Sequence, residues 1–339
     1  MLADFLGTDP RPRQAHTSQI AVSAEFAAAS TSAARRLRGQ VPSLAPSAAP
    51  ANLKNGPRVK VEVGDCRHQI MDRGELRNIE DAIRIGADLR HCWFRGHSRI
   101  FGSLLPSVHR EPFVSARENI EFWAGQRFRL RAASYHADLP KWDDYVSWLL
   151  LMQHHCVPTR LLDWTENVLV ALYFAVSDTE SEDGELWCMN HGELNWRSAN
   201  WKDCFPDTPP IRYLAAAAFI GREELAKFAI DVRCPTINGP LALVPPFQFP
   251  RMAAQMSRFT VHPSPDSQEQ IGFLLRGPSL VRYIVPANAK RDLAGRLARL
   301  GFSHETLYRS LDALGRTIRG EIVEPDFEIE PPPEFGGVH

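Results

Sequence analysis

Residues 158–176, PTRLLDWTENVLVALYFAV, carry the strongest structural signal in this 339-residue chain. The second half of the stretch, residues 165–176, is apolar almost all round, which predicts a helix buried in the core. Asp163 or Thr165 is expected to cap this helix, because short polar side chains accept hydrogen bonds from the first free N–H groups. In the first half, Arg160 and Asp163 lie among leucine and tryptophan residues, so both charges need partners.

Helix and strand patterns continue on both sides of this stretch. On the N-terminal side, the residue patterns predict strands at 59–63 and 91–96 and helices at 73–87, 116–136 and 141–155. Ser115 is the expected cap of the 116–136 helix, with Glu118 at the capping-box position. On the C-terminal side, the patterns predict strands at 184–190, 241–245, 271–275 and 280–286, a partly helical segment at 191–235, and helices near 288–300 and 305–319.

The interspersed order of these elements predicts the fold class. Helices and strands mix without a regular βαβ order, which favours an α+β protein. We expect a single mixed domain over residues 58–320, with helices packed around a small, mostly antiparallel sheet. Residues 1–56 are rich in Ala, Ser and Pro with few bulky apolar side chains, so a disordered segment is expected there. Residues 321–339 predict a loose tail rich in proline and acidic residues.

Composition excludes several classes of protein. The chain has 39 Lys+Arg against 40 Asp+Glu, a net charge of −1, which argues against a polyanion binder driven by overall charge. No run of 18 apolar residues is present, so we expect no membrane-spanning helix and no membrane partner. The six cysteines lack the spacing of a zinc site or a disulfide scaffold, and the first residues lack a secretory-signal pattern. We therefore expect a cytoplasmic protein with reduced thiols and no bound metal.

Three segments place charged side chains in apolar surroundings. In WFRGHS, residues 93–98, a strand would put Arg95 and Phe94 on opposite faces, and Gly96 would allow a close approach of backbone or ligand. The Arg95 guanidinium then needs an internal carboxylate or the phosphate of a ligand. In the second segment, Thr159, Arg160, Asp163 and Thr165 form either a structural cap with an ion pair or the rim of a cleft. A helix N-terminus beside such a cleft would favour anions.

A third segment holds polar residues further along the chain. Arg251 and Gln255 are four residues apart and share one face if the segment is helical. The cluster SQEQ, residues 267–270, follows and contains Glu269. Such a cluster can stabilise a cationic transition state, although a solvated turn is the commoner role of such residues.

Taken together, these segments resemble the FRG domain family, named for a Phe/Tyr-Arg-Gly motif. The resemblance covers about residues 60–319 and rests on Phe94-Arg95-Gly96, Leu104-Leu105-Pro106-Ser107 with Arg110, Leu151-Met152-Gln153-His154, residues 158–165 and 171–175, Arg251, Gln255 and Arg258-Phe259-Thr260, and the Leu-Asp element at 307–314. The family is in turn similar, more distantly, to the ADP-ribosyltransferase superfamily, which implies an ADP-ribosyltransferase-like fold.

This more distant likeness implies an activity and roles for individual residues. NAD would be the substrate, cleaved at the nicotinamide–ribose bond by an ADP-ribosyltransferase or an NAD glycohydrolase. Arg95, with Gly96 beside it, would hold the phosphates of NAD. Residues 159–165, which include Thr159, Arg160, Asp163 and Thr165, would shape the nicotinamide and ribose pocket with the 171–175 helix.

Catalysis would need a late acidic residue. Glu269 would assist the cationic transition state, or Gln255 would occupy that place, although a glutamine cannot act as a general base. The alternative is a non-catalytic module that binds a nucleotide or another anionic ligand in the same cleft. A third interpretation makes Arg95, Arg160 and Asp163 a buried structural network. The acceptor, protein or nucleic acid, and the oligomeric state are left open.

Overall fold

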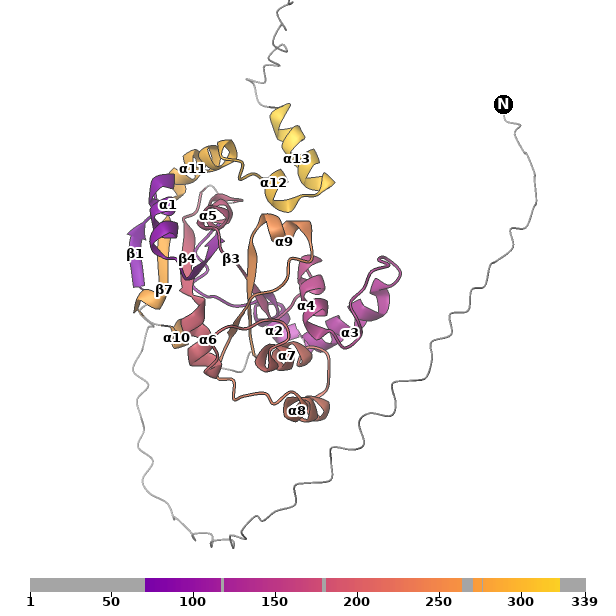
Figure 1. Ribbon diagram of the computed structural model, residues 1–339. Helices are drawn as coiled ribbons and strands as arrows, with labels where there is room; N and C mark the ends of the chain where they lie inside the picture. The colour runs from indigo at the N-terminus through magenta and orange to yellow at the C-terminus, as the bar shows by residue number, and fades with distance from the viewer. Residues whose placement is uncertain (1–70, 117–118, 179–180, 264–270, 276, 324–339) are drawn as a thin grey trace, which may run out of the picture. The chain divides into compact units, whose positions relative to one another are not determined.

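The computed structural model describes residues 71–116, 119–178, 181–263, 271–275 and 277–323 (Figure 1). Several sequence predictions lie outside these residues: the segment 1–56, the strand at 59–63, Glu118, Glu269 and the tail beyond residue 323. The α+β fold predicted from the sequence is confirmed for the part of the chain that is described.

A seven-stranded sheet forms the middle of the fold, in the order β1-β7-β4-β2-β3-β6-β5. The strands are β1 (Met71–Glu75), β2 (Cys92–His97), β3 (Leu161–Thr165), β4 (Gly184–Asn190), β5 (Leu241–Leu243), β6 (Ser257–Val261) and β7 (Leu280–Val285). Only β1 and β7 are parallel, and every other neighbouring pair is antiparallel. The sheet is therefore mostly antiparallel, as predicted, but larger than the small sheet expected.

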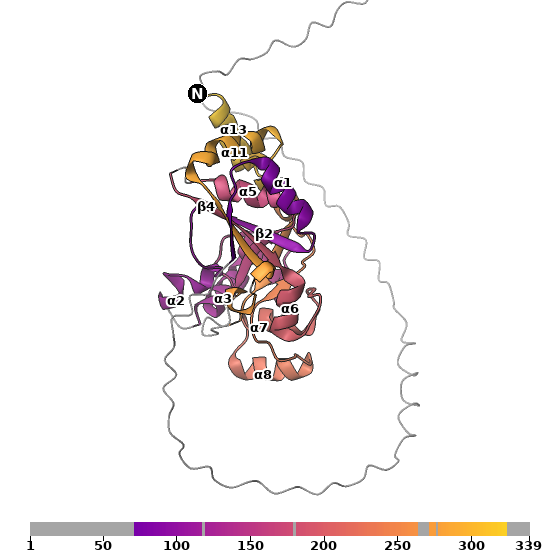
Figure 2. The ribbon, with the colours of Figure 1, turned by 90° about the vertical axis from the view of Figure 1, so that its left-hand side faces the viewer.

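Two groups of helices pack on this sheet at opposite ends (Figures 1 and 2). The first group is α1 (Ile79–Asp88), α5 (Val168–Val176) and α11 (Ala287–Arg299), which share a hydrophobic core with β2, β4 and β7. The second group is α3 (Ile120–Ala132), α4 (Tyr145–His154) and α7 (Pro209–Ala216), which share a separate core with β3, β5 and β6.

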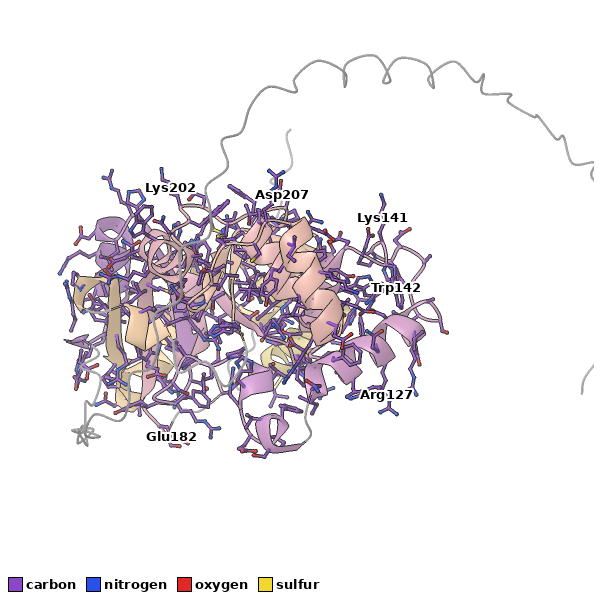
Figure 3. The ribbon with its side chains drawn as sticks, turned by 90° about the horizontal axis from the view of Figure 1, so that it is seen from below. Arg127, Lys141, Trp142, Glu182, Lys202 and Asp207 are labelled. Atoms are coloured by element: carbon purple, nitrogen blue, oxygen red, sulfur yellow. The ribbon has the colours of Figure 1, made fainter. Side chains whose placement is uncertain are left out.

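Shorter or peripheral helices complete the fold. They are the 3-10 helix η1 (Ser107–His109), α2 (Phe113–Ala116), α6 (His191–Ala199), α8 (Arg222–Asp231), α9 (Pro250–Ala254), α10 (Ile271–Leu274), α12 (His304–Tyr308) and α13 (Leu311–Glu321). Charged side chains such as those of Arg127, Glu182 and Lys202 point outward from this body (Figure 3). Within the described ranges, none of these helices has the length and apolar character needed to cross a bilayer.

Helix α5 lies directly on the sheet because glycines on two neighbouring strands make room for it. A Cβ atom at Gly96 of β2 would lie 1.8 Å from the Ala171 carbonyl oxygen, and one at Gly184 of β4 would lie 2.3 Å from the Ala175 carbonyl oxygen. Ala171 and Ala175 are fully buried and one helical turn apart, so small residues meet on both sides of the contact. The glycine of the Phe-Arg-Gly motif thus serves the approach of backbone, the first of the two roles expected for it.

The sheet opens between its two halves. Strand β2 pairs with β4 along its whole length, and β3 pairs likewise with β6. By contrast, β2 and β3 are in register at a single position, where Phe94 lies opposite Thr165. A third core cluster, with Trp93 of β2 and Trp164 of β3, contains residues of both halves.

Several predicted boundaries are wrong. Residues 161–165 form β3, and α5 begins only at Val168, so the helix cap is Asn167, whose side chain accepts from the Leu169 N–H. Asp163 and Thr165 therefore do not cap it. A short apolar run such as LLDWT fits a buried strand as well as a helix start, so the sequence pattern alone is ambiguous there.

Similar ambiguity explains the other differences. Residues 271–274 form the short helix α10, where a strand was expected. The predicted 73–87 helix begins only at Ile79, after β1 and a short loop. The predicted 116–136 helix begins at Ile120, and Ser115 belongs to α2, where its hydroxyl donates to Glu111. Strand β6 was not predicted.

Candidate functional site: the Arg95 pocket

A pocket of about 390 Å³ lies at the gap between β2 and β3. Its walls come from these two strands, the end of α4, one side of α5, and α9 with the residues that follow it. Among its lining residues are Arg95, Gly96, Asp163, Thr165, Arg251 and Gln255. The fold thus brings together residues from all three segments in which the sequence places charge among apolar residues. We call this cavity the Arg95 pocket.

Arg95 is held in place by neutral groups. Its Nε donates to His97 Nε2 at 2.7 Å, and its Nη1 donates to the backbone carbonyl oxygen of Asp163 at 2.6 Å. The nearest carboxylate oxygen in the described part of the chain, Asp163 Oδ2, is 4.0 Å from Nη1. Among the described residues, Nη2 has no hydrogen-bond acceptor, and 15% of the side chain is exposed. The guanidinium is therefore fixed and largely desolvated, yet its charge is not neutralised at close range.

Asp163 is oriented by Gln153 near the end of α4, which is in turn oriented by Thr159. Gln153 donates from Nε2 to Asp163 Oδ2 at 2.8 Å, and its Oε1 accepts from the Thr159 hydroxyl at 2.6 Å. Thr159 is fully buried, and its hydroxyl also accepts from the Leu161 N–H. Thr159 therefore has no surface for a ligand and orients Gln153, whereas the Asp163 side chain is 57% exposed.

On the opposite wall, a hydrogen bond joins β3 to the turn after α9. The buried Thr165 hydroxyl donates to the Gln255 carbonyl oxygen at 2.7 Å and accepts from the Asn167 N–H. The Gln255 amide nitrogen, Nε2, is buried and has no hydrogen-bond partner among the described residues. A buried donor without an acceptor is costly, so this amide is a candidate contact for a ligand oxygen.

A second cation, Arg251, lines the same pocket. Its guanidinium carbon lies 4.2 Å from the centre of the Tyr308 ring, within the range of a cation–π contact. Tyr308 belongs to α12 and also contacts the pocket residue Phe174 edge to face. The aromatic ring therefore orients Arg251 without neutralising it.

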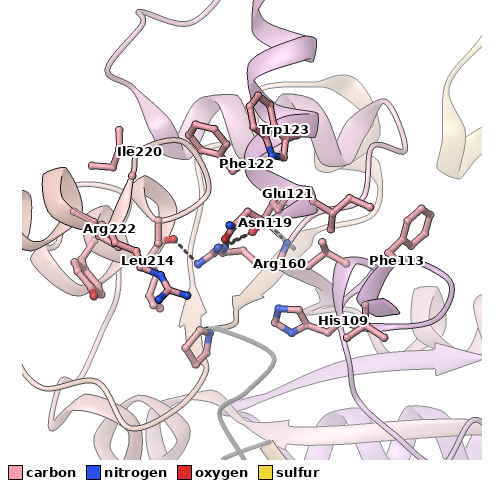
Figure 4. A pocket seen from close by; sticks show the side chains of 18 of the residues that line it. His109, Phe113, Asn119, Glu121, Phe122, Trp123, Arg160, Leu214, Ile220 and Arg222 are labelled. Carbon is pink, nitrogen blue, oxygen red and sulfur yellow. Dashed lines mark hydrogen bonds and ion pairs between the residues drawn. The ribbon is translucent and has the colours of Figure 1, made fainter. Parts of the chain in front are cut away.

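Arg160 lies elsewhere. Its Nε and Nη2 contact Glu121 Oε2 of α3 at 2.8 and 2.6 Å, and its Nη1 donates to the Leu214 carbonyl oxygen (Figure 4). This pair lines a different cavity of about 880 Å³, between α3 and α7. The two charges neutralise each other, so Arg160 has a structural role here and is not part of the Arg95 pocket.

The charge balance of the Arg95 pocket is positive. Arg95 and Arg251 line it, Asp163 is its only carboxylate among the described residues, and Arg110 lies close enough to both Arg95 and Asp163 to influence them. Burial lowers the pKa of the Arg95 guanidinium to about 10, and the Asp163 charge only partly opposes this. The pocket therefore suits an anion.

Comparison with known proteins supports one family. The FRG domain model matches residues 90–184, and no curated protein and no solved structure matches the chain. The chain contains an FRG domain. The match runs from the residues just before β2 to the first residue of β4, so it includes Arg95, Gln153, Asp163 and α5.

The FRG match covers one side of the pocket only. Arg251 and Gln255 lie beyond residue 184, so the segment around α9 closes the pocket from outside the matched region. Within the FRG domain, the Phe-Arg-Gly motif has a direct structural meaning. Phe94 is buried in the core with α5, Gly96 admits the α5 backbone, and Arg95 projects to the gap between strands.

Sequence reasoning did not assign roles to several residues of this site. Gln153 was noted only as part of a motif, and Tyr308 was not considered. The signal for Gln153 is a polar residue at the end of an otherwise apolar helix, which suggests an inward-facing hydrogen bond. Glu269, the expected catalytic acid, lies outside the described residues. Within them, no three His, Cys, Asp or Glu side chains are arranged to hold a metal ion.

Proposed function

We propose that the Arg95 pocket of this FRG domain binds a nucleotide through its phosphate groups. The observation that carries the proposal is the state of Arg95, a fixed and largely desolvated guanidinium with no carboxylate nearer than 4.0 Å among the described residues. A phosphate would accept charge-assisted hydrogen bonds from its unused N–H groups. Arg251 supplies a second cation, and the Gln255 amide supplies a donor for a phosphate or ribose oxygen.

The size of the pocket agrees with this ligand class. Its volume of about 390 Å³ lies toward the lower end of the range for small-molecule sites, about 300–1,000 Å³. It would hold one nucleotide or one half of a dinucleotide. Such a ligand would also meet apolar side chains, since Val157, Val170 and Phe174 line the same pocket.

Calorimetry with ADP-ribose at low salt tests the proposal. The wild-type chain is expected to bind, and Arg95→Gln to weaken binding at least about tenfold, which corresponds to about 1.4 kcal/mol. Arg77→Gln is the matched control, because Arg77 is an exposed arginine whose ion pair with Glu75 is on the surface. No binding by the wild type, or equal loss in both variants, would contradict the proposal.

A second candidate function is the cleavage of NAD at the nicotinamide–ribose bond, and Asp163 favours it. Nicotinamide would leave with the electrons of the broken C–N bond. The Asp163 carboxylate, exposed in the pocket and aimed by Gln153, would stabilise the positive charge on the ribose. Addition of water, with release of a proton, would then give ADP-ribose, whereas addition of an acceptor group would give an ADP-ribosylated product.

Incubation with NAD labelled in the adenosine half separates this activity from binding alone. A catalytic pocket is expected to release nicotinamide, and Asp163→Asn to slow the release at least about a hundredfold, within the range for a removed electrostatic stabiliser. Binding of NAD with neither nicotinamide release nor label transfer would leave the nucleotide-binding function and eliminate cleavage.

A further inference from the structure

A line of polar side chains reaches Arg95 from the far edge of the sheet. Asp72 on β1 binds Arg282 on β7 through two hydrogen bonds of 2.8 and 2.9 Å. Arg282 Nη1 lies 3.5 Å from Glu185 Oε2 on β4, and Glu185 Oε1 lies 2.6 Å from His97 Nδ1 on β2. His97 Nε2 in turn accepts from Arg95 Nε. These strands are consecutive neighbours, so the line crosses the sheet strand by strand.

The contacts fix the protonation state of His97. An arginine Nε can only donate, so His97 Nε2 must be the unprotonated, accepting nitrogen. The remaining proton of the neutral ring then sits on Nδ1 and is donated to Glu185. Burial lowers the pKa of His97 to about 4, and the Arg95 charge lowers it as well. The ring is therefore neutral at pH 7.

Glu185 holds His97 in the tautomer with the proton on Nδ1. It is fully buried, and its Oε1 also accepts from the Phe101 N–H at 3.3 Å. Burial alone would raise the pKa of this carboxyl, but its hydrogen bonds, the one from His97 first among them, lower it overall. Arg282 balances the charge from the other side. An ionised carboxylate cannot donate, so it accepts only the Nδ1–H form of the ring.

A neutral histidine at position 97 binds Arg95 without cancelling its positive charge, which a carboxylate at this position would do. An aspartate or glutamate in contact with Arg95 would neutralise the guanidinium, which is the common arrangement for a buried arginine. The neutral ring orients the guanidinium and leaves its charge for a ligand. Glu185, which sets the orientation, is one residue further away.

We propose that His97 is a positioning residue, locked in its Nδ1–H tautomer by Glu185, that aims Arg95 into the pocket as a cation to which no described carboxylate is hydrogen-bonded. The evidence for the tautomer and for the orientation is the geometry of two hydrogen bonds, from Arg95 Nε to His97 Nε2 and between His97 Nδ1 and Glu185 Oε1. The consequence for ligand binding rests on the proposed nucleotide-binding function.

The tautomer is tested first, in the absence of ligand. In protein labelled with 15N at histidine and arginine, the His97 signals are identified by their loss in His97→Gln and the Arg95 Nε–H signal by its loss in Arg95→Gln. At pH 7 the ring is expected to show a protonated Nδ1 and an unprotonated Nε2, and the Arg95 Nε–H to exchange slowly with water. An Nε2–H tautomer, a doubly protonated ring, or rapid exchange of the Arg95 Nε–H would overturn the proposal.

The effect on binding is tested with two variants at the same position. A glutamine can accept from Arg95 and donate to Glu185, so His97→Gln is expected to keep the ADP-ribose Kd within about threefold and the Arg95 Nε–H protected. His97→Leu fills similar space without hydrogen bonds and is expected to raise the Kd at least tenfold, with loss of that protection. A folded His97→Leu protein that binds as the wild type does would overturn the positioning role.

These outcomes distinguish the positioning proposal from the proposed function. If the wild-type protein does not bind ADP-ribose, the nucleotide-binding function fails, and the tautomer measurement still decides whether His97 positions Arg95. If His97→Leu does not fold, the glutamine variant and the spectra of the wild-type protein decide instead. Rapid exchange of the Arg95 Nε–H with water in His97→Gln would then count against the hydrogen-bonding role of His97.

Discussion

Replacing Glu121 by alanine is expected to lower the free energy of unfolding by about 3–5 kcal/mol, the usual cost of leaving one partner of a buried ion pair alone. Glu121 accepts from the Arg160 N–H as well as from its guanidinium, with Arg160 only 8% exposed. Without this carboxylate, the Leu214 carbonyl would be the one hydrogen-bond partner left to the Arg160 guanidinium among the residues that the structure describes. The loss therefore includes a buried charge and a buried backbone donor.

Urea denaturation followed by circular dichroism measures this effect. Asp292→Ala is the matched control, because Asp292 pairs with Arg296 at the surface of α11, with side chains 61% and 44% exposed. Removing a surface pair of this kind costs about 0–1 kcal/mol. If Glu121→Ala is no more destabilising than Asp292→Ala, the buried Arg160–Glu121 pair is not a structural support of the fold.

Replacing Gly96 by alanine is expected to destabilise the protein by at least about 3 kcal/mol, the upper part of the range for overpacked cores. The added Cβ would lie 1.8 Å from the Ala171 carbonyl oxygen and 2.7 Å from the Ala175 N. Both are backbone atoms of α5, so no side-chain rotation can relieve the clash. Helix α5 would have to move away from β2, which would also deform the wall of the Arg95 pocket.

Gly315→Ala provides the contrasting control for this prediction. Gly315 lies inside α13, and a Cβ atom there would meet nothing within 4 Å. Alanine is favoured over glycine inside a helix by about 0.5–1 kcal/mol, so this variant is expected to be slightly more stable. Thermal melts of both variants give the two melting temperatures. A Gly96→Ala protein with the melting temperature of the wild type would show that the close packing of α5 on β2 does not require glycine at this position.

The sequence was sufficient to predict the fold class and to single out several residues that line the Arg95 pocket. Arg95 and Asp163 were identified because each places a charge among large apolar residues. The error over Arg160 has a clear physical source. Residues 161–165 form a strand, in which alternate residues face opposite sides. A period of two along this segment places Arg160 on the side away from Asp163, whereas the expected helix start grouped them together.

Other parts of the site depend on long-range packing. Gln255 reaches the pocket because the turn after α9 is bonded to Thr165, which is 90 residues away in the chain. Tyr308 reaches Arg251 through the packing of α12 against α9. Local patterns contain no information about such contacts. The role of His97 also required coordinates, since its tautomer follows from the two atoms that its ring nitrogens face.

Protection of Cys156 most directly tests the claim that a ligand binds at Arg95. The Cys156 thiol is exposed and lines the Arg95 pocket, whereas the thiol of Cys234 lies outside it. The rate of alkylation at each cysteine is read by mass spectrometry of peptides, with and without saturating ADP-ribose. We predict that ADP-ribose slows the alkylation of Cys156 in the wild type, leaves Cys234 unchanged, and has no effect on Cys156 in Arg95→Gln. Equal rates of Cys156 alkylation in the wild type with and without ADP-ribose would contradict the claim that this ligand binds at Arg95.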